Sequence, residues 1–226
     1  SGTGLGQIGV ALEEVGANVE FIRAQMGDML PDTPDGYDAM VVLGGGQNAL
    51  ADAQSPWLPR LCDLMRAFDE AGRSVLGVCL GSQLLARAYG GKNIIGGASE
   101  FGWQEIELTN EGIADPIFTG LPSAFRSFQW HDDTFTLPQG SVRLAGSKRV
   151  ANQAFRIGRA SYGFQFHFEA HQQMVTTWNE TFVDWLAEAQ PDWSARHPVD
   201  ATRYGAKADE DGLMIARNWV RTLSAA

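Results

Sequence analysis

Cysteine and basic side chains are scarce in this chain, and their scarcity limits what the protein can be. With two cysteines among 226 residues, we expect a buried hydrophobic core rather than a disulfide framework. Cys62 and Cys79 could pair, but a reduced, cytoplasmic protein is the simpler expectation. Lysine and arginine number 17 against 27 acidic residues, for a formal net charge of −10. That charge argues against a nucleic-acid partner, because phosphate backbones are bound mainly by Lys and Arg.

Long apolar runs and clusters of metal ligands are also missing. No run approaches the roughly 18 apolar residues of a membrane span, and no signal peptide is visible. The four histidines include one i,i+4 pair, His167 and His171, which does not make a zinc site by itself. We therefore expect no membrane contact, no metal and no cofactor.

Strands and helices alternate along the chain, which favours an α/β fold, with a parallel sheet and helices on both faces. We expect one domain over residues 1–190 and a C-terminal helical extension of it over 191–226. Glycines 2, 4 and 6 precede the first predicted helix, and we interpret them as a strand-to-helix turn whose strand lies upstream of the given sequence. Other elements are predicted as strands over 19–22, 37–43, 75–78 and 101–108, and as helices over 56–71, 172–187 and 212–223.

A cysteine stands where a predicted buried strand turns into a predicted helix. The pattern Gly77-Val-Cys-Leu-Gly81 matches the G-x-S-x-G nucleophile elbow, with Cys79 in place of the serine. The helix N-terminus beneath such a residue favours the reactive thiolate. The alternative is a buried core cysteine, which is the usual state of a free cysteine. We interpret Cys62, on the helix over 56–71, as such a core residue.

A possible base and its orienting acid follow in the segment Phe164-Gln-Phe-His-Phe-Glu169. In an extended segment, His167 and Glu169 point to the same face, because side chains alternate along a strand. Glu169 could then accept from one ring nitrogen of His167 while the other nitrogen faces Cys79. A solvated edge strand would also alternate polar and apolar residues, so that alternative stays open here.

Three consecutive glycines, 44 to 46, follow another predicted strand. They permit close approach of the backbone and unusual φ and ψ values, as an anion-binding nest requires. A flexible loop is the alternative. Because ligands bind at the carboxyl ends of the strands in such sheets, one crevice could hold this loop, Cys79 and His167.

Together, the motifs around Cys79 and His167 resemble the class I, triad-type glutamine amidotransferases, over about residues 37 to 190. The resemblance is greatest to the stand-alone branch that is similar to the glutaminase domain of GMP synthase. It implies a flavodoxin-like, doubly wound and mostly parallel sheet, and a catalytic triad of Cys79, His167 and Glu169. It also implies the reaction, in which Cys79 attacks the glutamine amide, ammonia leaves, and water releases glutamate from a γ-glutamyl thioester.

The resemblance implies further site residues. The N–H groups of Gly46 and Leu80 resemble the oxyanion hole, and Gly45 lies in the same glycine-rich loop, which we expect to border the substrate. Gln83 matches the glutamine that contacts the substrate in the family. The segment from Gln129 to Asp132 resembles the one whose backbone holds the amino-acid end of the substrate. Its members are Gln129, Trp130, His131 and Asp132.

Two positions depart from the family pattern. Gln47 replaces the usual proline after the glycines, and Asp132 replaces the usual glycine after the histidine. These changes leave the triad intact but put the substrate in doubt. A carboxylate near the α-amino group could favour an amine-bearing ligand, or it could crowd the pocket.

Three functions are therefore carried forward. The first is a glutamine-hydrolysing enzyme, whose ammonia passes to a separate synthase subunit or is released, because the chain has no room for a synthetase domain. The second is a γ-glutamyl peptidase or hydrolase, which uses the same triad and thioester on another small γ-glutamyl compound. The third is a non-catalytic module that binds and regulates a partner. Loss of the cysteine or the histidine would mark the third, and both are present.

Overall fold

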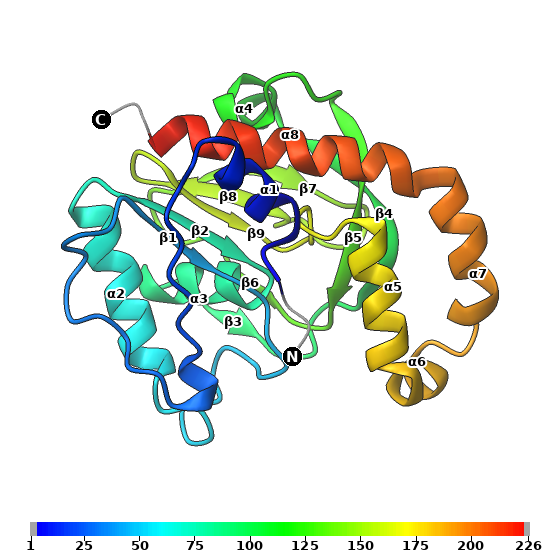
Figure 1. Ribbon diagram of the computed structural model, residues 1–226, viewed down its shortest axis with the longest axis horizontal. Coiled ribbons are helices and arrows are strands. Elements are labelled where there is room, and N and C mark those ends of the chain that lie inside the picture. Colours follow the sequence, from blue (N-terminus) through cyan, green and yellow to red (C-terminus); the bar gives the residue numbers. More distant parts are fainter. Residues whose placement is uncertain (1–3, 224–226) are drawn as a thin grey trace.

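The computed structural model describes residues 4–223 and contains one large sheet between helices (Figure 1). Its strands lie in the order β1-β2-β9-β8-β7-β4-β5. The bounds are β1 Ala39–Val42, β2 Ser74–Val78, β4 Glu100–Leu108, β5 Ala124–His131, β7 Val142–Gly146, β8 Ala154–Ile157 and β9 Ser161–Phe164. A separate antiparallel pair joins β3 (Asn93–Ile94) to β6 (Thr134–Phe135).

The predicted α/β class is confirmed, but the sheet is mixed rather than mostly parallel. Only β1, β2 and β9 run parallel, whereas the pairs from β9 across to β5 are antiparallel. The links between β7 and β8 and between β8 and β9 are too short for the crossover that a parallel pair requires. The parallel part of the sheet is therefore the part that carries Cys79.

Helices cover both faces of the sheet, as predicted. α1 (Gly6–Glu14) and α8 (Ala206–Leu223) lie side by side on one face (Figure 1), where Leu76 packs with Trp219 in one cluster. α2 (Leu58–Glu70) and α3 (Leu80–Ala88) cover the other face, where Val75 packs with Leu61. Because Val75 and Leu76 are neighbours in β2, they must point to opposite faces.

A third helical group packs beside the antiparallel end of the sheet. α5 (Gln172–Thr181), α6 (Val183–Ala189) and α7 (Trp193–Asp200) surround an aromatic cluster that includes Phe128 and Trp193. The predicted helix over 172–187 is thus two helices, which meet at Phe182. The predicted C-terminal helix is longer than expected: it begins at Ala206 and continues from α7 through a π-helical turn, Ala201–Gly205.

The predicted strand over 19–22 is wrong. These residues have no sheet partner, and the backbone there is irregular up to a 3₁₀ turn, η1, Ala24–Met26. Val19 and Phe21 are substantially exposed, so their β-branched and aromatic character is not used in the core. The two remaining short helices are α4 (Asn110–Ala114) and the 3₁₀ turn η2 (Pro116–Phe118).

Residues 191–223, which we expected to extend the main domain, contribute to its core. In α8, Ile215 and Ala216 are fully buried. Trp219 donates from its indole N–H to the Ser74 hydroxyl of β2, at 2.9 Å. In the described part of the chain, no helix combines the length and apolar character needed to cross a lipid bilayer.

Candidate active site

Cys79 occupies a strained turn between β2 and α3. Its φ of 52° and ψ of −110° make it the only residue other than glycine with a positive φ between residues 4 and 223. A Cβ on Gly81 would lie 2.0 Å from the Val42 carbonyl oxygen, and one on Gly77 would lie 2.4 Å from the Gly81 oxygen. The strand and the helix can therefore approach this closely only with glycine on either side of the cysteine.

His167 and Cys79 border the same point in space. A Cβ placed on Gly44 would lie 3.2 Å from Cε1 of His167 and 3.4 Å from Cβ of Cys79. The Cys79 side chain lies close enough to His167 to raise the pKa of that histidine, and its sulfur lies 3.7 Å from the Trp130 carbonyl oxygen. Residues from three distant parts of the sequence thus meet at the sulfur.

Glu169 completes the arrangement, although the local backbone differs from our expectation. Its Oε1 lies 2.7 Å from Nδ1 of His167, and both residues are buried. The expected extended segment ends with β9 at Phe164, and Phe168 and Glu169 form a turn. His167 is held there because its backbone N–H donates to the Phe128 carbonyl at 2.8 Å. The solvated edge strand is excluded by this burial.

The turn that carries Glu169 is clamped between two helices that we did not associate with the site. The N–H of Gln7 in α1 donates to the Glu169 carbonyl at 2.9 Å. A Cβ on Gly6 would lie 2.0 Å from that oxygen, and one on Gly212 in α8 would lie 2.1 Å from the Phe168 oxygen. Gly6 is therefore more than part of a turn, whereas Gly2 lies outside the described residues. No local signal could have revealed these contacts, because the partners are far apart in sequence.

The charges around His167 favour its protonated form. Burial acts to lower the pKa of His167, but the Glu169 carboxylate and then the Cys79 sulfur act to raise it. Their combined effect leaves that pKa well above its ordinary value. The resulting imidazolium can stabilise negative charge on the sulfur at neutral pH. By contrast, burial raises the pKa of the Cys62 thiol to about 11, which agrees with the expected core role of Cys62.

The glycine-rich loop approaches Cys79 closely but does not adopt the expected unusual φ values. None of Gly44, Gly45 and Gly46 has a positive φ. A Cβ on Gly45 would lie 3.0 Å from Cδ2 of Leu80, whereas one on Gly46 would meet nothing within 4 Å. Leu80 is the first residue of α3, so its N–H has no acceptor within the helix. The roles of Gly46 and Leu80 as oxyanion donors remain predictions.

The residues predicted to bind substrate divide into two groups. The first group lies at the site: the Trp130 carbonyl faces Cys79, and Asp132, two residues later, is exposed. The side chains of Gln83, Gln129 and His131 are instead buried. Nε2 of Gln83 lies 3.2 Å from the Gln165 side-chain oxygen and 3.5 Å from the Asp133 carbonyl. These side chains belong to a polar network behind the site.

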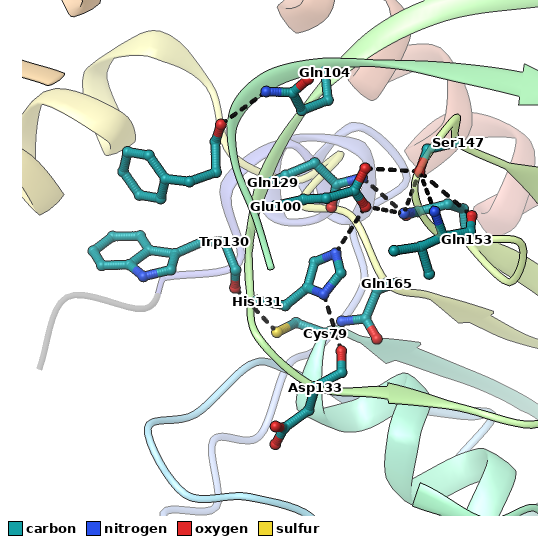
Figure 2. A network of polar contacts seen from close by, with 12 residues as sticks. Cys79, Glu100, Gln104, Gln129, Trp130, His131, Asp133, Ser147, Gln153 and Gln165 are labelled. Carbon is teal, nitrogen blue, oxygen red and sulfur yellow. Dashed lines mark hydrogen bonds and ion pairs between the residues drawn. The ribbon is translucent and has the colours of Figure 1, made fainter. Parts of the chain in front are cut away.

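That network contains residues that the sequence did not single out (Figure 2). The amide of Gln129 donates to Gln153, and Gln153 donates in turn to Glu100. Glu100 also accepts from Ser147 and lies against His131. No sequence signal marks Glu100 or Ser147, because they reach the site only through strand pairing. Between residues 4 and 223, no group of three potential metal ligands is assembled.

Comparison with known proteins gives one family and several relatives. The family model described as glutamine amidotransferase class-I matches residues 7–182. The glutamine amidotransferase-like protein YfeJ of Salmonella typhimurium is 30% identical over 79% of this chain and 76% of its own length. Gamma-glutamyl peptidase 5 of Arabidopsis thaliana is 28% identical over 72% of this chain and 66% of its own. A glutamine-hydrolyzing GMP synthase of Thermus thermophilus is 33% identical over 78% of this chain. The chain spans only 34% of that synthase.

Crystal structures of two glutamine amidotransferases share the fold over nearly the whole chain. The protein from Thermotoga maritima superposes with a TM-score of 0.82 at 27% identity, over 97% of this chain and 92% of its own. The protein from Methylobacillus flagellatus gives a TM-score of 0.87 at 27% identity, over 98% and 91%. The likeness includes the C-terminal helices, which lie beyond the region that the family model matches.

Proposed function

Because the chain belongs to the glutamine amidotransferase class-I family, we propose that it hydrolyses the side-chain amide of glutamine to glutamate and ammonia. The observation that carries this proposal is the buried chain of contacts from Cys79 through His167 to Glu169, with Nδ1 of His167 2.7 Å from the carboxylate. A nucleophile, a base and an orienting acid in this order are what acyl transfer through a covalent intermediate requires.

The reaction proceeds in two halves. The Cys79 thiolate attacks the amide carbon, and the N–H groups of Leu80 and Gly46 stabilise the oxyanion that forms. His167 gives its proton to the leaving nitrogen, the C–N bond breaks, and ammonia departs from a γ-glutamyl thioester. Water then gives a proton to His167 and attacks the thioester, so that the C–S bond breaks and glutamate leaves.

The amino-acid end of glutamine binds to the segment from Gln129 to Asp132. The Trp130 carbonyl accepts a hydrogen bond from the α-ammonium group, because this oxygen already lies 3.7 Å from the sulfur. The exposed Asp132 adds negative charge nearby. Gly45 borders the pocket, while Gln83 supports it from the buried side, where it contacts Gln165.

We assign the ammonia to a separate acceptor, a synthase subunit or the solvent. Relatives called GMP synthase carry about two thirds of their length outside the part that this chain matches. Cys62 and Cys79 are both free thiols, which agrees with a reducing, cytoplasmic compartment.

A second candidate, hydrolysis of a larger γ-glutamyl compound, is favoured by aromatic side chains next to the site. We define the aromatic ledge as Trp130, Phe182 and Trp185. The Trp130 ring lies 5.2 Å from that of Phe182 and 5.3 Å from that of Trp185. Phe182 and Trp185 are 43% and 40% exposed. Ammonia is too small to use such a surface, whereas an apolar leaving group on a γ-glutamyl compound could pack on it.

The test is release of ammonia, glutamate or amine from glutamine and from γ-glutamyl amides with small and aromatic leaving groups. Turnover of glutamine that is lost in Cys79→Ala would establish the glutaminase. A preference for aromatic leaving groups that falls in Trp185→Ala, but not in the exposed control Phe21→Ala, would establish the second candidate. Absence of turnover of every compound, in a protein whose Cys79 is still alkylated, would contradict both and support the regulatory module.

A further inference from the structure

A second histidine–carboxylate pair lies behind the strand that faces Cys79 (Figure 2). Nε2 of His131 is 3.2 Å from Oε2 of Glu100, and these side chains are 1% and 3% exposed. The two residues lie directly opposite one another on β5 and β4. Trp130, whose carbonyl faces the sulfur, is the residue before His131. One member of the pair is therefore next in sequence to the residue whose carbonyl faces Cys79, but neither side chain of the pair touches Cys79.

The partners of Glu100 identify it as an acceptor at both oxygens. The Ser147 oxygen accepts from the Val150 N–H at 3.0 Å and from the Gln153 amide at 3.3 Å. Its own hydrogen is then free for Oε1 of Glu100, at 2.7 Å. Oε2 accepts from the Gln153 amide at 2.5 Å. Both oxygens thus receive hydrogens, as a carboxylate would.

The two ring nitrogens of His131 have different partners. Nδ1 lies 2.9 Å from the Asp133 carbonyl oxygen, which can only accept, so Nδ1 carries a hydrogen. Nε2 lies 3.2 Å from Oε2 of Glu100 and makes no hydrogen bond. The ring is thus placed by one hydrogen bond on one side and by close contact with a buried carboxyl group on the other.

The ring of His131 fixes the backbone next to Trp130. It contacts β4 through Glu100 and the turn after β5 through the Asp133 carbonyl. Because Trp130 directly precedes His131, these two contacts restrain the peptide that carries the Trp130 carbonyl. Buried polar groups can fix one conformation in preference to others.

We propose that Glu100 and His131 are positioning residues, which hold the Trp130 carbonyl where it receives the α-ammonium group of the substrate. The proposal rests on the proposed function, because it concerns how that site binds an amino acid. It assigns the pair no part in the chemical step, since neither side chain contacts Cys79 or His167 in the described contacts.

The main variant is Glu100→Gln, which keeps the size of the side chain and removes its charge. The KM for glutamine should rise about tenfold while kcat stays within about threefold, because binding is lost and the triad is not. Ser147→Ala removes only one hydrogen bond to Glu100 and no charge. This milder variant allows KM to be measured even if Glu100→Gln fails to fold. Its KM should rise about threefold. Without substrate, iodoacetamide should alkylate Cys79 in both variants within about twofold of the wild-type rate.

The matched control is Asp115→Asn, which removes a buried carboxylate whose partners are Arg156 and Tyr162. It should lower thermal stability and leave KM unchanged. If KM rises equally in this control, or if the rate of alkylation falls with Glu100→Gln, the pair is merely structural and the proposal fails.

The same measurements separate this proposal from the proposed function. An active wild type whose KM is unaffected by both substitutions overturns the positioning role alone. If the wild type turns over no γ-glutamyl compound, and if glutamine does not protect its Cys79 from iodoacetamide, both the proposed function and the positioning role are overturned.

Discussion

Cys79 holds a backbone conformation that side chains rarely adopt, with φ at 52°. Such a residue costs about 1–3 kcal/mol and persists only where its surroundings enforce it. The neighbouring glycines, Gly77 and Gly81, enforce it here through backbone contacts shorter than a Cβ would allow. The turn thereby holds the sulfur next to His167 and 3.7 Å from the Trp130 carbonyl oxygen.

Substitutions of Cys79 should reveal that backbone strain as a difference in the free energy of unfolding. Cys79→Gly should be more stable than Cys79→Ala by about 1 kcal/mol, because glycine adopts positive φ without penalty. At an ordinary helical position alanine is more stable than glycine, so Ala67→Gly within α2 should lower the free energy of unfolding by about 1 kcal/mol. Urea unfolding of the three variants measures the difference. Equal stability of the two Cys79 variants would contradict the strain.

The two cysteines should differ sharply in reactivity. At pH 7.5 iodoacetamide should modify Cys79 alone, because burial raises the pKa of Cys62 to about 11 and leaves almost no thiolate there. Mass spectrometry of the wild type and of Cys79→Ala checks the site. Prompt labelling of folded Cys79→Ala would show that Cys62 is the reactive thiol and would remove the basis of the triad.

Glu169 should set the pH dependence of that reactivity. In Glu169→Gln the leading influence that raises the pKa of His167 is lost, while burial, which lowers it, remains. The imidazolium should then lose its proton at lower pH, so alkylation of Cys79 should fall about tenfold at pH 7 and recover at alkaline pH. Asp115→Asn serves as the control for loss of a buried carboxylate. An unchanged pH profile in Glu169→Gln would mean that Glu169 does not act on His167.

At the scale of elements, the turn that carries Glu169, the acid of the proposed triad, depends on two helices from opposite ends of the chain. α1 approaches the Glu169 carbonyl through Gly6 and Gln7, and α8 approaches the Phe168 carbonyl through Gly212. Because these are contacts with backbone, neither side can yield by a change of rotamer. The position of the turn therefore follows the packing of α1 against α8.

Enlarging Gly212 should damage the site from a distance. Its new Cβ would lie 2.1 Å from the Phe168 oxygen, so Gly212→Ala must displace the turn or the helix. We expect a loss of about 1–3 kcal/mol of stability and at least a tenfold fall in turnover, since Glu169 loses its alignment with His167. Gly9→Ala, whose Cβ would meet only the Leu5 side chain, is the matched control. Normal turnover in Gly212→Ala would contradict the clamp.

At the scale of the whole molecule, one sheet connects all three hydrophobic clusters. Its parallel strands lead to Cys79, and its antiparallel strands carry Trp130 and residues of the polar network. The C-terminal helix α8 closes one face, with Trp219 1% exposed. The site is therefore supported by every layer of the molecule.

This connection predicts a single cooperative unfolding transition. Trp219→Ala should cost about 3–5 kcal/mol and shift one transition, seen equally by circular dichroism and fluorescence. Val199→Ala on the exposed surface of α7 should have little effect. Two separate transitions would instead show that residues 191–223 form an independent unit.

The sequence by itself determined the class of fold and the residues from which the proposed chemistry is built. The pattern around Cys79 and the His-x-Glu pair depend on neighbours within a few residues, and alternation of strands and helices reports local periodicity. The predicted strand over 19–22 is wrong because β propensity is a local property, whereas a strand also needs a neighbouring strand to pair with. The sheet is mixed rather than mostly parallel because strand pairing depends on partners far away in the sequence.

Only the tertiary structure decided what supports that chemistry. Glu100 faces His131 because β4 pairs with β5 in one register, and Gly212 meets Phe168 because α8 returns across the sheet. Contacts between residues so far apart leave no periodic or spacing signal in the chain. Their strength also depends on burial, since the same charges in water would interact only weakly. The proposed reacting groups are therefore evident from local motifs, whereas the groups that hold them in place are not.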